Sequence, residues 1–311
     1  MNRAKLALIY LSEALIVAFV ASIVLLEVNL LANIARTGEV KTALVGGWGS
    51  RGQAANQLDA PRGMAVWGGF VYVADMANSR VQKFSSTGSP VARWGGRGEG
   101  DGHLFEPSDV AVDAHGFVYV VDPWTAVVQK FTADGEFVAR YGGPEFQFYR
   151  PQGVAVDRVG NIYVTDTGGG RVLVFDHGGR LLAKWGRIGT EPGEMKEPLG
   201  IAVDGQGFVY VADTGNGRIQ RFDSSGRFVA QWPVHGNPRY LTIDNQGRVY
   251  VTDIMNNTVW VFHASGGLAG KVSGRDDRPL FDQPQGIAVG DDRTLYVVNS
   301  ARVSVYEAIN Q

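Results

Sequence analysis

The chain of 311 residues contains no cysteine and only five histidines. The absence of cysteine excludes disulfides, cysteine-ligated zinc, iron–sulfur clusters and thiol catalysis. The five histidines leave few candidates for acid–base or metal chemistry. An excess of positive charge is also missing, since 29 Lys and Arg stand against 31 Asp and Glu. This balance argues against a protein that mainly binds nucleic acid.

Helical periodicity is missing after Ala35, whereas glycine is abundant, with 42 residues. That is about twice its usual share. So much glycine, with ordinary valine and aromatic content, indicates many short strands joined by tight turns. The apolar fraction of 45% is sufficient for a core and excludes a disordered chain.

The first forty residues differ from the rest. Leu6 to Leu26 is an apolar run that contains one charge, Glu13, and a helix of ~20 residues spans a bilayer. Arg3 and Lys5 precede the run, which favours a cytoplasmic N-terminus. We therefore predict an uncleaved membrane anchor and short linker in residues 1–41. A cleaved signal peptide and a buried helix of a soluble protein are the alternatives.

The predicted anchor has one face suited to a partner helix. Ala14, Ala18 and Ser22 recur every four residues and allow close backbone approach to another membrane helix. Glu13 and Glu27 share a face, because fourteen residues are nearly four full turns. Two interpretations of Glu13 and Glu27 are open. In the first, one of the two carboxylates faces a partner helix; in the second, both lie at the membrane interfaces and have no function.

Residues 42–311 contain one unit repeated six times. One copy is EPLGIAVDGQGFVYVADTGNGRIQRFDSSGRFVAQW, from Glu197 to Trp232, and it contains four strand signals separated by turn residues. Four antiparallel strands every ~40–45 residues indicate the blades of a propeller. The repeats begin at Pro61, Pro107, Pro151, Pro198, Pro238 and Pro284.

The sequence also predicts how the ring closes. The sixth copy supplies only three strands, whereas Ala43 to Gly49 resembles the fourth strand of another copy and has no blade of its own. We therefore predict that this N-terminal strand completes the last blade, which removes the open sheet edges.

The pattern P-x-G-[VI]-A-V-D-x-x-G-[NF]-[VI]-Y-V-[AT]-D-T-x-N-x-R-[VI]-x-x-F resembles NHL repeats, from Ala43 to Glu307. The resemblance implies an all-β, six-bladed propeller whose channel mouth is the functional surface. Three copies depart from the pattern: Asp122-Pro-Trp-Thr replaces the usual Asp-Thr-x-Asn in the second, Tyr240 replaces glycine in the fifth, and the sixth lacks the first-turn aspartate and shortens the next turn (Asn299 to Arg302). Some members of the family bind RNA on a basic face, but residues 42–311 carry 25 Lys and Arg against 28 Asp and Glu.

Two repeated series invite a functional reading. The first is an aspartate in the second turn of five copies, which we expect to bind backbone donors and nearby arginines and not to be catalytic. The second is an aromatic residue on five of the fourth strands, which we expect to pack between blades, with sugar stacking as the alternative. The two series are Asp75, Asp122, Asp166, Asp213 and Asp253, and Trp48, Trp94, Tyr141, Trp185 and Trp232.

Each blade contributes one position to the channel mouth directly after the repeat proline. In propellers that resemble amidating lyases a metal-binding His stands there, but this chain has none at these positions, so a His-ligated zinc or iron site is not expected. Asp109 adds a carboxylate where four copies have glycine. We predict a site for a small anionic ligand or an acidic partner loop, with an empty solvated mouth as the alternative. Its residues are Arg62, Ser108, Asp109, Gln152, Arg239 and Gln285.

These features predict an extracytoplasmic scaffold or protein-interaction subunit of a membrane-associated complex, in the periplasm or outside the cell. We expect protein partners, no nucleic acid, no catalysis and no cofactor. The first alternative is a propeller lyase or lactonase that uses a channel Ca²⁺, since carboxylates and backbone carbonyls suffice for that ion. The second is a module that binds envelope carbohydrate.

The charge bias of the N-terminal segment makes a topology prediction. A reporter fused after Gln311 should be active only outside the cytoplasm, because Arg3 and Lys5 retain the N-terminus inside. The same reporter fused to residues 42–311 alone is the control and should stay in the cytoplasm. Cytoplasmic activity of the full-length fusion, or a mature N-terminus beyond Ala35, would contradict the anchor.

Overall fold

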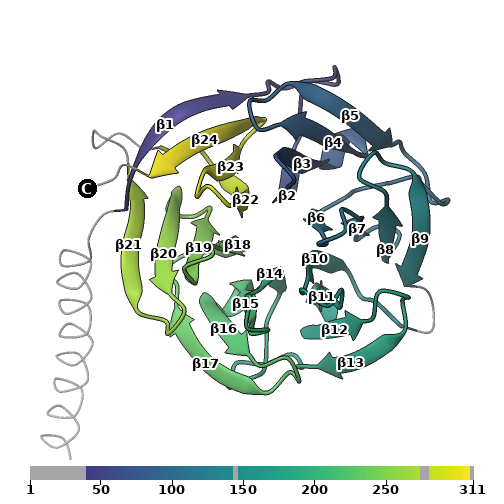
Figure 1. Ribbon diagram of the computed structural model, residues 1–311. Helices are drawn as coiled ribbons and strands as arrows, with labels where there is room; N and C mark the ends of the chain where they lie inside the picture. The colour runs from purple at the N-terminus through teal and green to yellow at the C-terminus, as the bar shows by residue number, and fades with distance from the viewer. Residues whose placement is uncertain (1–39, 143–145, 274–279, 309–311) are drawn as a thin grey trace, which may run out of the picture.

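Six four-stranded blades surround one axis in the computed structural model, which describes residues 40–142, 146–273 and 280–308 (Figure 1). Within each blade, neighbouring strands are antiparallel and the first strand lies nearest to the axis. The prediction of an all-β, six-bladed propeller is confirmed.

The strands follow the repeats in order. The first three blades are β2 (Pro61–Trp67), β3 (Phe70–Asp75), β4 (Arg80–Ser85) and β5 (Pro90–Gly95); β6 (Asp109–Val112), β7 (Val118–Asp122), β8 (Val127–Phe131) and β9 (Phe137–Gly142); and β10 (Pro151–Val156), β11 (Ile162–Asp166), β12 (Arg171–Phe175) and β13 (Leu181–Trp185). The last three are β14 (Pro198–Val203), β15 (Val209–Asp213), β16 (Arg218–Phe222) and β17 (Phe228–Pro233); β18 (Pro238–Ile243), β19 (Arg248–Asp253), β20 (Thr258–His263) and β21 (Leu268–Ser273); and β22 (Pro284–Val289), β23 (Leu295–Asn299), β24 (Arg302–Ala308) and β1 (Val40–Trp48). Short 3₁₀ turns connect the second and third strands in three blades: η1 (Met76–Asn78), η2 (Thr167–Gly169) and η3 (Thr214–Asn216).

The burial of each strand explains its composition. Every residue of β7 and β11 is buried, because neighbouring blades cover both faces of the second strand. Such strands consist of apolar and β-branched residues without a polar face. The fourth strands, such as β5, alternate between exposed and half-buried residues because they form the rim.

The repeated aspartates are structural, as predicted. Asp75 is fully buried, receives a hydrogen bond from Arg80 Nε at 2.7 Å and accepts the backbone N–H of Asp59 at 2.7 Å. The same ion pair recurs between Asp166 and Arg171 and between Asp213 and Arg218, at 2.7 and 2.6 Å. Each aspartate thereby ties the loop before its blade to the turn after the second strand.

The rim aromatics pack between blades, also as predicted. The indole of Trp94 lies against Gly135 in a turn of the next blade, and a β-carbon at Gly135 would overlap the ring. Gly135 also has a φ of +93°, which disfavours any other residue. The same contact joins Trp48 to Gly88, Tyr141 to Gly179, Trp185 to Gly226 and Trp232 to Gly266.

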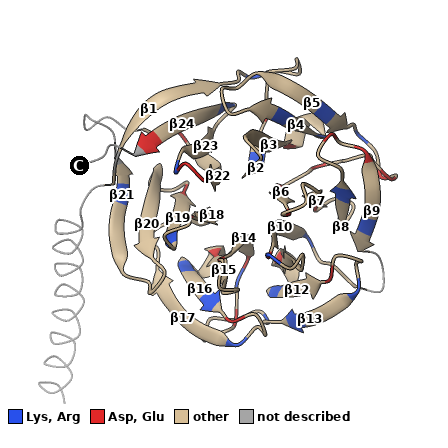
Figure 2. Ribbon diagram, viewed as in Figure 1, with Lys and Arg blue, Asp and Glu red and all other residues tan. Residues whose placement is uncertain are grey.

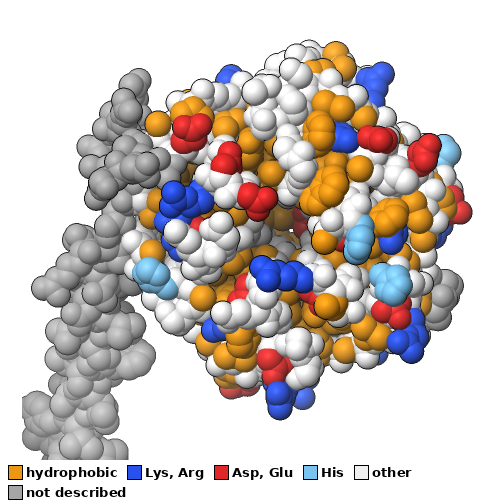
Figure 3. Space-filling model, viewed as in Figure 1, with side chains coloured by type: hydrophobic (Ala, Val, Ile, Leu, Met, Phe, Trp, Pro, Cys, Tyr) orange, Lys and Arg blue, Asp and Glu red, His pale blue; other side chains and the backbone are white. Residues whose placement is uncertain are grey.

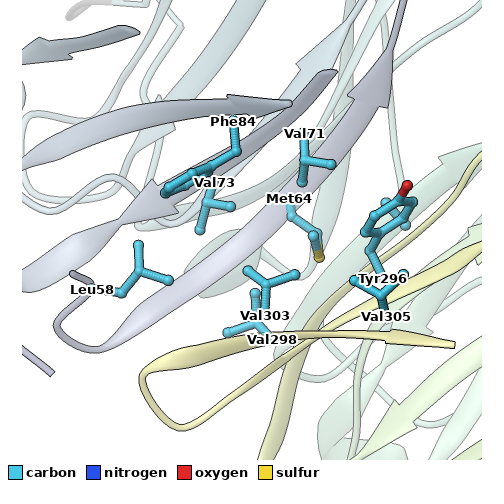
Figure 4. Packing of buried hydrophobic residues seen from close by; sticks show 10 residues of the cluster. Leu58, Met64, Val71, Val73, Phe84, Tyr296, Val298, Val303 and Val305 are labelled. Atoms are coloured by element: carbon cyan, nitrogen blue, oxygen red, sulfur yellow. The ribbon is translucent and has the colours of Figure 1, made fainter. Parts of the chain in front are cut away.

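The N-terminal strand closes the ring, as the sequence predicts. β1 pairs antiparallel with β24 from Thr42–Ala308 to Trp48–Val303, and so becomes the fourth strand of the last blade. Val40 and Lys41 also pair in parallel with Val272 and Ser273 of β21, which joins the fifth and sixth blades. The first and last blades share an apolar cluster, in which Met64 of the first blade lies beside Tyr296 and Val303 of the last (Figure 4).

The predicted anchor and its partner face, with Glu13, Ala14, Ala18, Ser22 and Glu27, lie outside the described residues. Among the residues that the structure describes, no helix is long and apolar enough to cross a bilayer. The prediction of a membrane-spanning helix therefore has no support from the structure.

The closure contact makes a stability prediction. Trp48 packs against Phe84 and Tyr296, with ring centroids 5.7 and 6.1 Å apart. Trp48→Ala should lower the free energy of unfolding by ~3 kcal/mol, because it removes the aromatic contact that joins the last blade to the first. Denaturant titration of the purified protein measures this loss.

The control is Trp124→Ala, since Trp124 is 60% exposed and belongs to no closure contact. Its effect should stay below ~1 kcal/mol. Equal stability of the Trp48 variant and the original protein would show that β1 does not hold the ring closed.

Candidate functional site

The channel mouth consists of the residues that follow each repeat proline at the start of the inner strands. Two of these positions interact directly, since Arg62 Nη1 donates to Gln285 Oε1 at 3.1 Å across the first and last blades. Ser108 Oγ donates to the backbone carbonyl of Gln152 at 2.7 Å, which joins the second and third blades. The structure therefore joins four of the predicted residues in two pairs, each across a boundary between neighbouring blades.

The next position along each inner strand is glycine in four blades because space is short there. A β-carbon at Gly286 would collide with the Arg62 carbonyl oxygen and with the backbone of Gly63. A β-carbon at Gly200 would lie 2.7 Å from the Cα of Tyr240. The two blades without glycine carry Asp109 and Tyr240, and these blades lie opposite each other in the ring (Figure 1).

Tyr240 spans the channel. Its hydroxyl donates a 2.9 Å hydrogen bond to the backbone carbonyl of Ser108, which belongs to the opposite blade. The same carbonyl accepts the N–H of Gly63 at 2.9 Å, so both of its acceptor positions are used. Tyr240 departs from the repeat but is not among the site residues predicted from the sequence. Its position could have indicated the site, because Tyr240 replaces the same repeat glycine as Asp109, three blades away.

Asp109 is buried beside Tyr240. Its carboxylate accepts the backbone N–H groups of Val110 at 2.9 Å and Val154 at 3.1 Å, the second from the neighbouring blade. Burial raises the pKa of this carboxyl to about 8, although the two N–H donors act in the opposite direction. A carboxyl with this pKa is neutral over much of the physiological range and exchanges its proton near neutrality.

A cavity of about 200 Å³ adjoins Asp109 and Tyr240 inside the channel. It extends along the inner strands away from the Arg62 mouth, and its wall includes Ala65, Ala155 and Thr242. The space-filling view shows the ring hollowed at its centre (Figure 3). Asp109 and Tyr240 thus form a layer between the mouth and this cavity.

Two cations act on the layer from the mouth side. Burial raises the pKa of Tyr240 above its usual value, the charge of Asp109 raises it further, and Arg62 and Arg239 lower it. Burial also lowers the pKa of Arg239, and the nearby Arg62 guanidinium adds to the effect. Elsewhere charges of both signs are scattered over the blades and loops (Figure 2).

The channel does not suit a calcium ion. Among the described residues no three His, Asp or Glu side chains gather in a way that could hold a metal. The mouth and its layer offer one carboxyl of raised pKa, and two guanidiniums face it from the mouth. Ca²⁺ takes about six to eight oxygen ligands, among them carboxylates, and is repelled by nearby cations, so a single carboxyl beside two guanidiniums fits this ion poorly.

Three segments match the family model of the NHL repeat: residues 58–84, 148–175 and 195–222. These three segments therefore match NHL repeats, which the sequence pattern predicts for six copies. Among curated proteins none matches the chain significantly.

Solved structures share the fold. A streptogramin B lyase superposes with a TM-score of 0.62 at 14% identity, covering 85% of this chain and 97% of the lyase. A gluconolactonase of Xanthomonas campestris gives 0.61 at 20% identity, covering 80% and 86%. A luciferin-regenerating enzyme gives 0.61 at 15% identity, covering 81% and 92%.

These neighbours correct the expectation of a protein without catalysis. That expectation rested on the absence of familiar catalytic motifs, yet the same fold is used by a lyase, a lactonase and a luciferin-regenerating enzyme. Identities of 14 to 20% show the fold alone, so they identify no substrate.

The raised pKa of Asp109 makes a prediction about stability. An unfolded chain releases the Asp109 proton near pH 4, whereas the folded chain keeps it to about pH 8. Between these values the folded state binds more protons, so stability falls as pH rises, by up to ~1.4 kcal/mol per pH unit. In Asp109→Asn this slope should disappear.

Denaturant titrations of Asp109→Asn and of the original protein between pH 5 and pH 9 measure how the free energy of unfolding changes with pH. A pH-independent destabilisation by the substitution shifts the whole curve and does not alter its slope. Asp291→Asn, at an exposed turn position, is the control and should keep the original slope. Parallel curves for the original protein and Asp109→Asn would show that Asp109 is ionised throughout.

Proposed function

We propose that the protein is an enzyme of the propeller lyase or lactonase kind, which cleaves a carbon–oxygen bond of a small ester or lactone in the central channel. The observation that carries the proposal is the buried Asp109, whose pKa of about 8 suits proton transfer at neutral pH. Strongly perturbed carboxyls in a cavity are candidates for catalytic groups. The shared fold of the lyase and the gluconolactonase supports the same reading.

Asp109 is the proposed general base. Elimination begins with removal of a proton from carbon and hydrolysis with removal of a proton from water, so both reactions need such a group. The carboxyl lines the channel cavity, where a small substrate can reach it. The two backbone N–H groups that bind the carboxylate oxygens fix its position and stabilise the ionised form.

Tyr240 is the proposed donor to the substrate oxygen. Its hydroxyl lies in the layer that ends the cavity and now donates to the Ser108 carbonyl. Burial and the charge of Asp109 raise the pKa of this hydroxyl more than Arg62 and Arg239 lower it, so the hydroxyl keeps its proton and can donate it in a hydrogen bond. A donor held in place before the reaction lowers the energy of a developing oxyanion.

The size of the cavity limits the substrate. Its volume of about 200 Å³ is below the ~300–1,000 Å³ of pockets that enclose drug-sized ligands. A single small ring or ester group fits, and a folded polymer does not. This favours a low-molecular-weight lactone over the carbohydrate-binding alternative.

We propose further that residues 1–41 anchor this enzyme in a membrane. The apolar run Leu6 to Leu26 and the preceding Arg3 and Lys5 support this location. An enzyme held outside the cytoplasm in this way would meet small molecules that arrive from the surroundings. Protein partners of the anchor remain part of the proposal.

The proposal predicts an enzymatic loss in Asp109→Asn. Against a panel of γ- and δ-lactones and small esters, kcat should fall by ~100-fold or more, because removal of a general base costs this much. In the original protein the rate should rise with pH and level off above about pH 8, where Asp109 is ionised.

Asp291→Asn is the matched control and should keep full activity, because this aspartate lies in an exposed turn. Full activity of Asp109→Asn would remove Asp109 from the reaction. A folded original protein that turns over no member of the panel would refute the assignment to this class.

A further inference from the structure

The mouth side of the Asp109–Tyr240 layer contains two arginines at equivalent repeat positions. Arg62 is the second residue of β2 and Arg239 the second residue of β18, and the sixth blade lies between their blades (Figure 1). Arg62 leans toward that blade, where it binds Gln285. The charges are near enough for Arg62 to lower the pKa of Arg239.

No carboxylate neutralises this pair among the residues that the structure describes. The ion pairs of the described chain include neither Arg62 nor Arg239. Glu197 acts on Arg239 from an exposed position, but its influence is weaker than that of Arg62. In contrast, Arg80 and Arg218 each bind a fully buried aspartate. Two like charges without a counter-ion are held together here at an electrostatic cost.

The donors of the pair are also incompletely used. Arg239 Nε is buried and has no hydrogen-bond partner. Arg62 Nε has only the thioether of Met76 at 3.5 Å, which is a weak acceptor. A buried charged donor without a partner is costly, and an anion would remove that cost at both guanidiniums.

The space for a ligand lies beside Arg62. A groove of about 280 Å³ runs between the first and last blades, and Arg51, Asp59, Gln283, Gln285 and Ser300 line it together with Arg62. Asp59 is already paired with Arg51 at 3.1 Å, so it does not compete for Arg62. The groove reaches Arg62 and not Arg239, so it can hold the polar remainder of a molecule whose anionic group lies beside Arg62 on the side of the channel.

We infer that Arg62 and Arg239 form a binding site for a small oxyanion, a carboxylate or phosphate group of a small molecule, at the channel mouth. Planar guanidiniums bind both groups through paired N–H donors. Gln285 holds Arg62 in place, and Tyr240 separates the anion from the Asp109 cavity. This inference is about anion binding alone, and it does not depend on whether the channel is catalytic.

The test is a titration of the full-length protein with phosphate and with acetate, at constant ionic strength maintained by chloride. Calorimetry and the midpoint of thermal unfolding are the readouts. At least one of the two anions should bind and raise the midpoint, and the anion that binds identifies the group. Arg62→Gln and Arg239→Gln should each weaken binding by about tenfold or more, because each removes charged hydrogen bonds.

Two controls separate binding from folding. Arg227→Gln removes an exposed arginine outside the mouth and should leave the affinity within about twofold. In chloride alone, Arg62→Gln should unfold at a temperature no lower than the original protein, because it relieves the repulsion between the two guanidiniums. A purely structural arginine would give a lower temperature and no change in affinity.

Either of two results would overturn the inference: no stabilisation by phosphate or acetate beyond that by chloride, or unchanged affinity in the double variant of Arg62 and Arg239. Asp109→Asn should keep its anion affinity within about twofold, since it leaves both guanidiniums in place. Loss of turnover with retained anion binding would therefore distinguish this site from the proposed reaction.

Discussion

The shortage of space at the axis is the constraint on which the rest of this structure depends. Six inner strands converge there, and a β-carbon at Gly286 would lie 3.0 Å from Gly63 Cα. Glycine at this position lets neighbouring inner strands approach closely, and the approach sets the size of the channel. A blade that carries a side chain at this position must direct it into the remaining space. Asp109 and Tyr240 therefore meet in the channel as a consequence of the fold.

The fold was predictable because its information is repeated. Six copies of one pattern gave the strands and blades, and the unpaired segment Ala43 to Gly49 gave the closing strand. The channel was predictable only in part. The departure at Asp109 was visible in the sequence, but the bond from Tyr240 to Ser108 joins residues 132 positions apart. No repeat pattern encodes that contact, because it depends on which blades are opposite and on how far the tyrosine reaches.

The absence of catalysis was inferred from missing motifs, and this inference was wrong because motifs belong to particular families and not to the fold. The carboxyls of this chain show a better criterion. Asp75 and Asp213 occur in equivalent turns, and each is bound by an arginine that neutralises it. Asp109 is just as deeply placed but has only backbone donors, so burial determines its protonation. Aspartates of one chain therefore differ in their partners: an arginine binds Asp75 and Asp213, whereas Asp109 has two backbone donors and a pKa that burial raises.

The stability of the ring comes from contacts away from the axis. The aspartate–arginine pairs fix the loops before the blades, and the rim aromatics join neighbouring blades. The first strand of the described chain, β1, pairs with the last strand, β24, and so closes the ring. None of these contacts involves Asp109, Tyr240 or Arg239. Groups that are costly when unpaired can therefore occupy the channel without opening the ring, because these contacts hold neighbouring blades together away from the axis. This separation explains how one repeated scaffold keeps its shape while its axis carries a carboxyl of raised pKa on one side of a tyrosine and, on the other, two guanidiniums that take part in none of the ion pairs of the described residues.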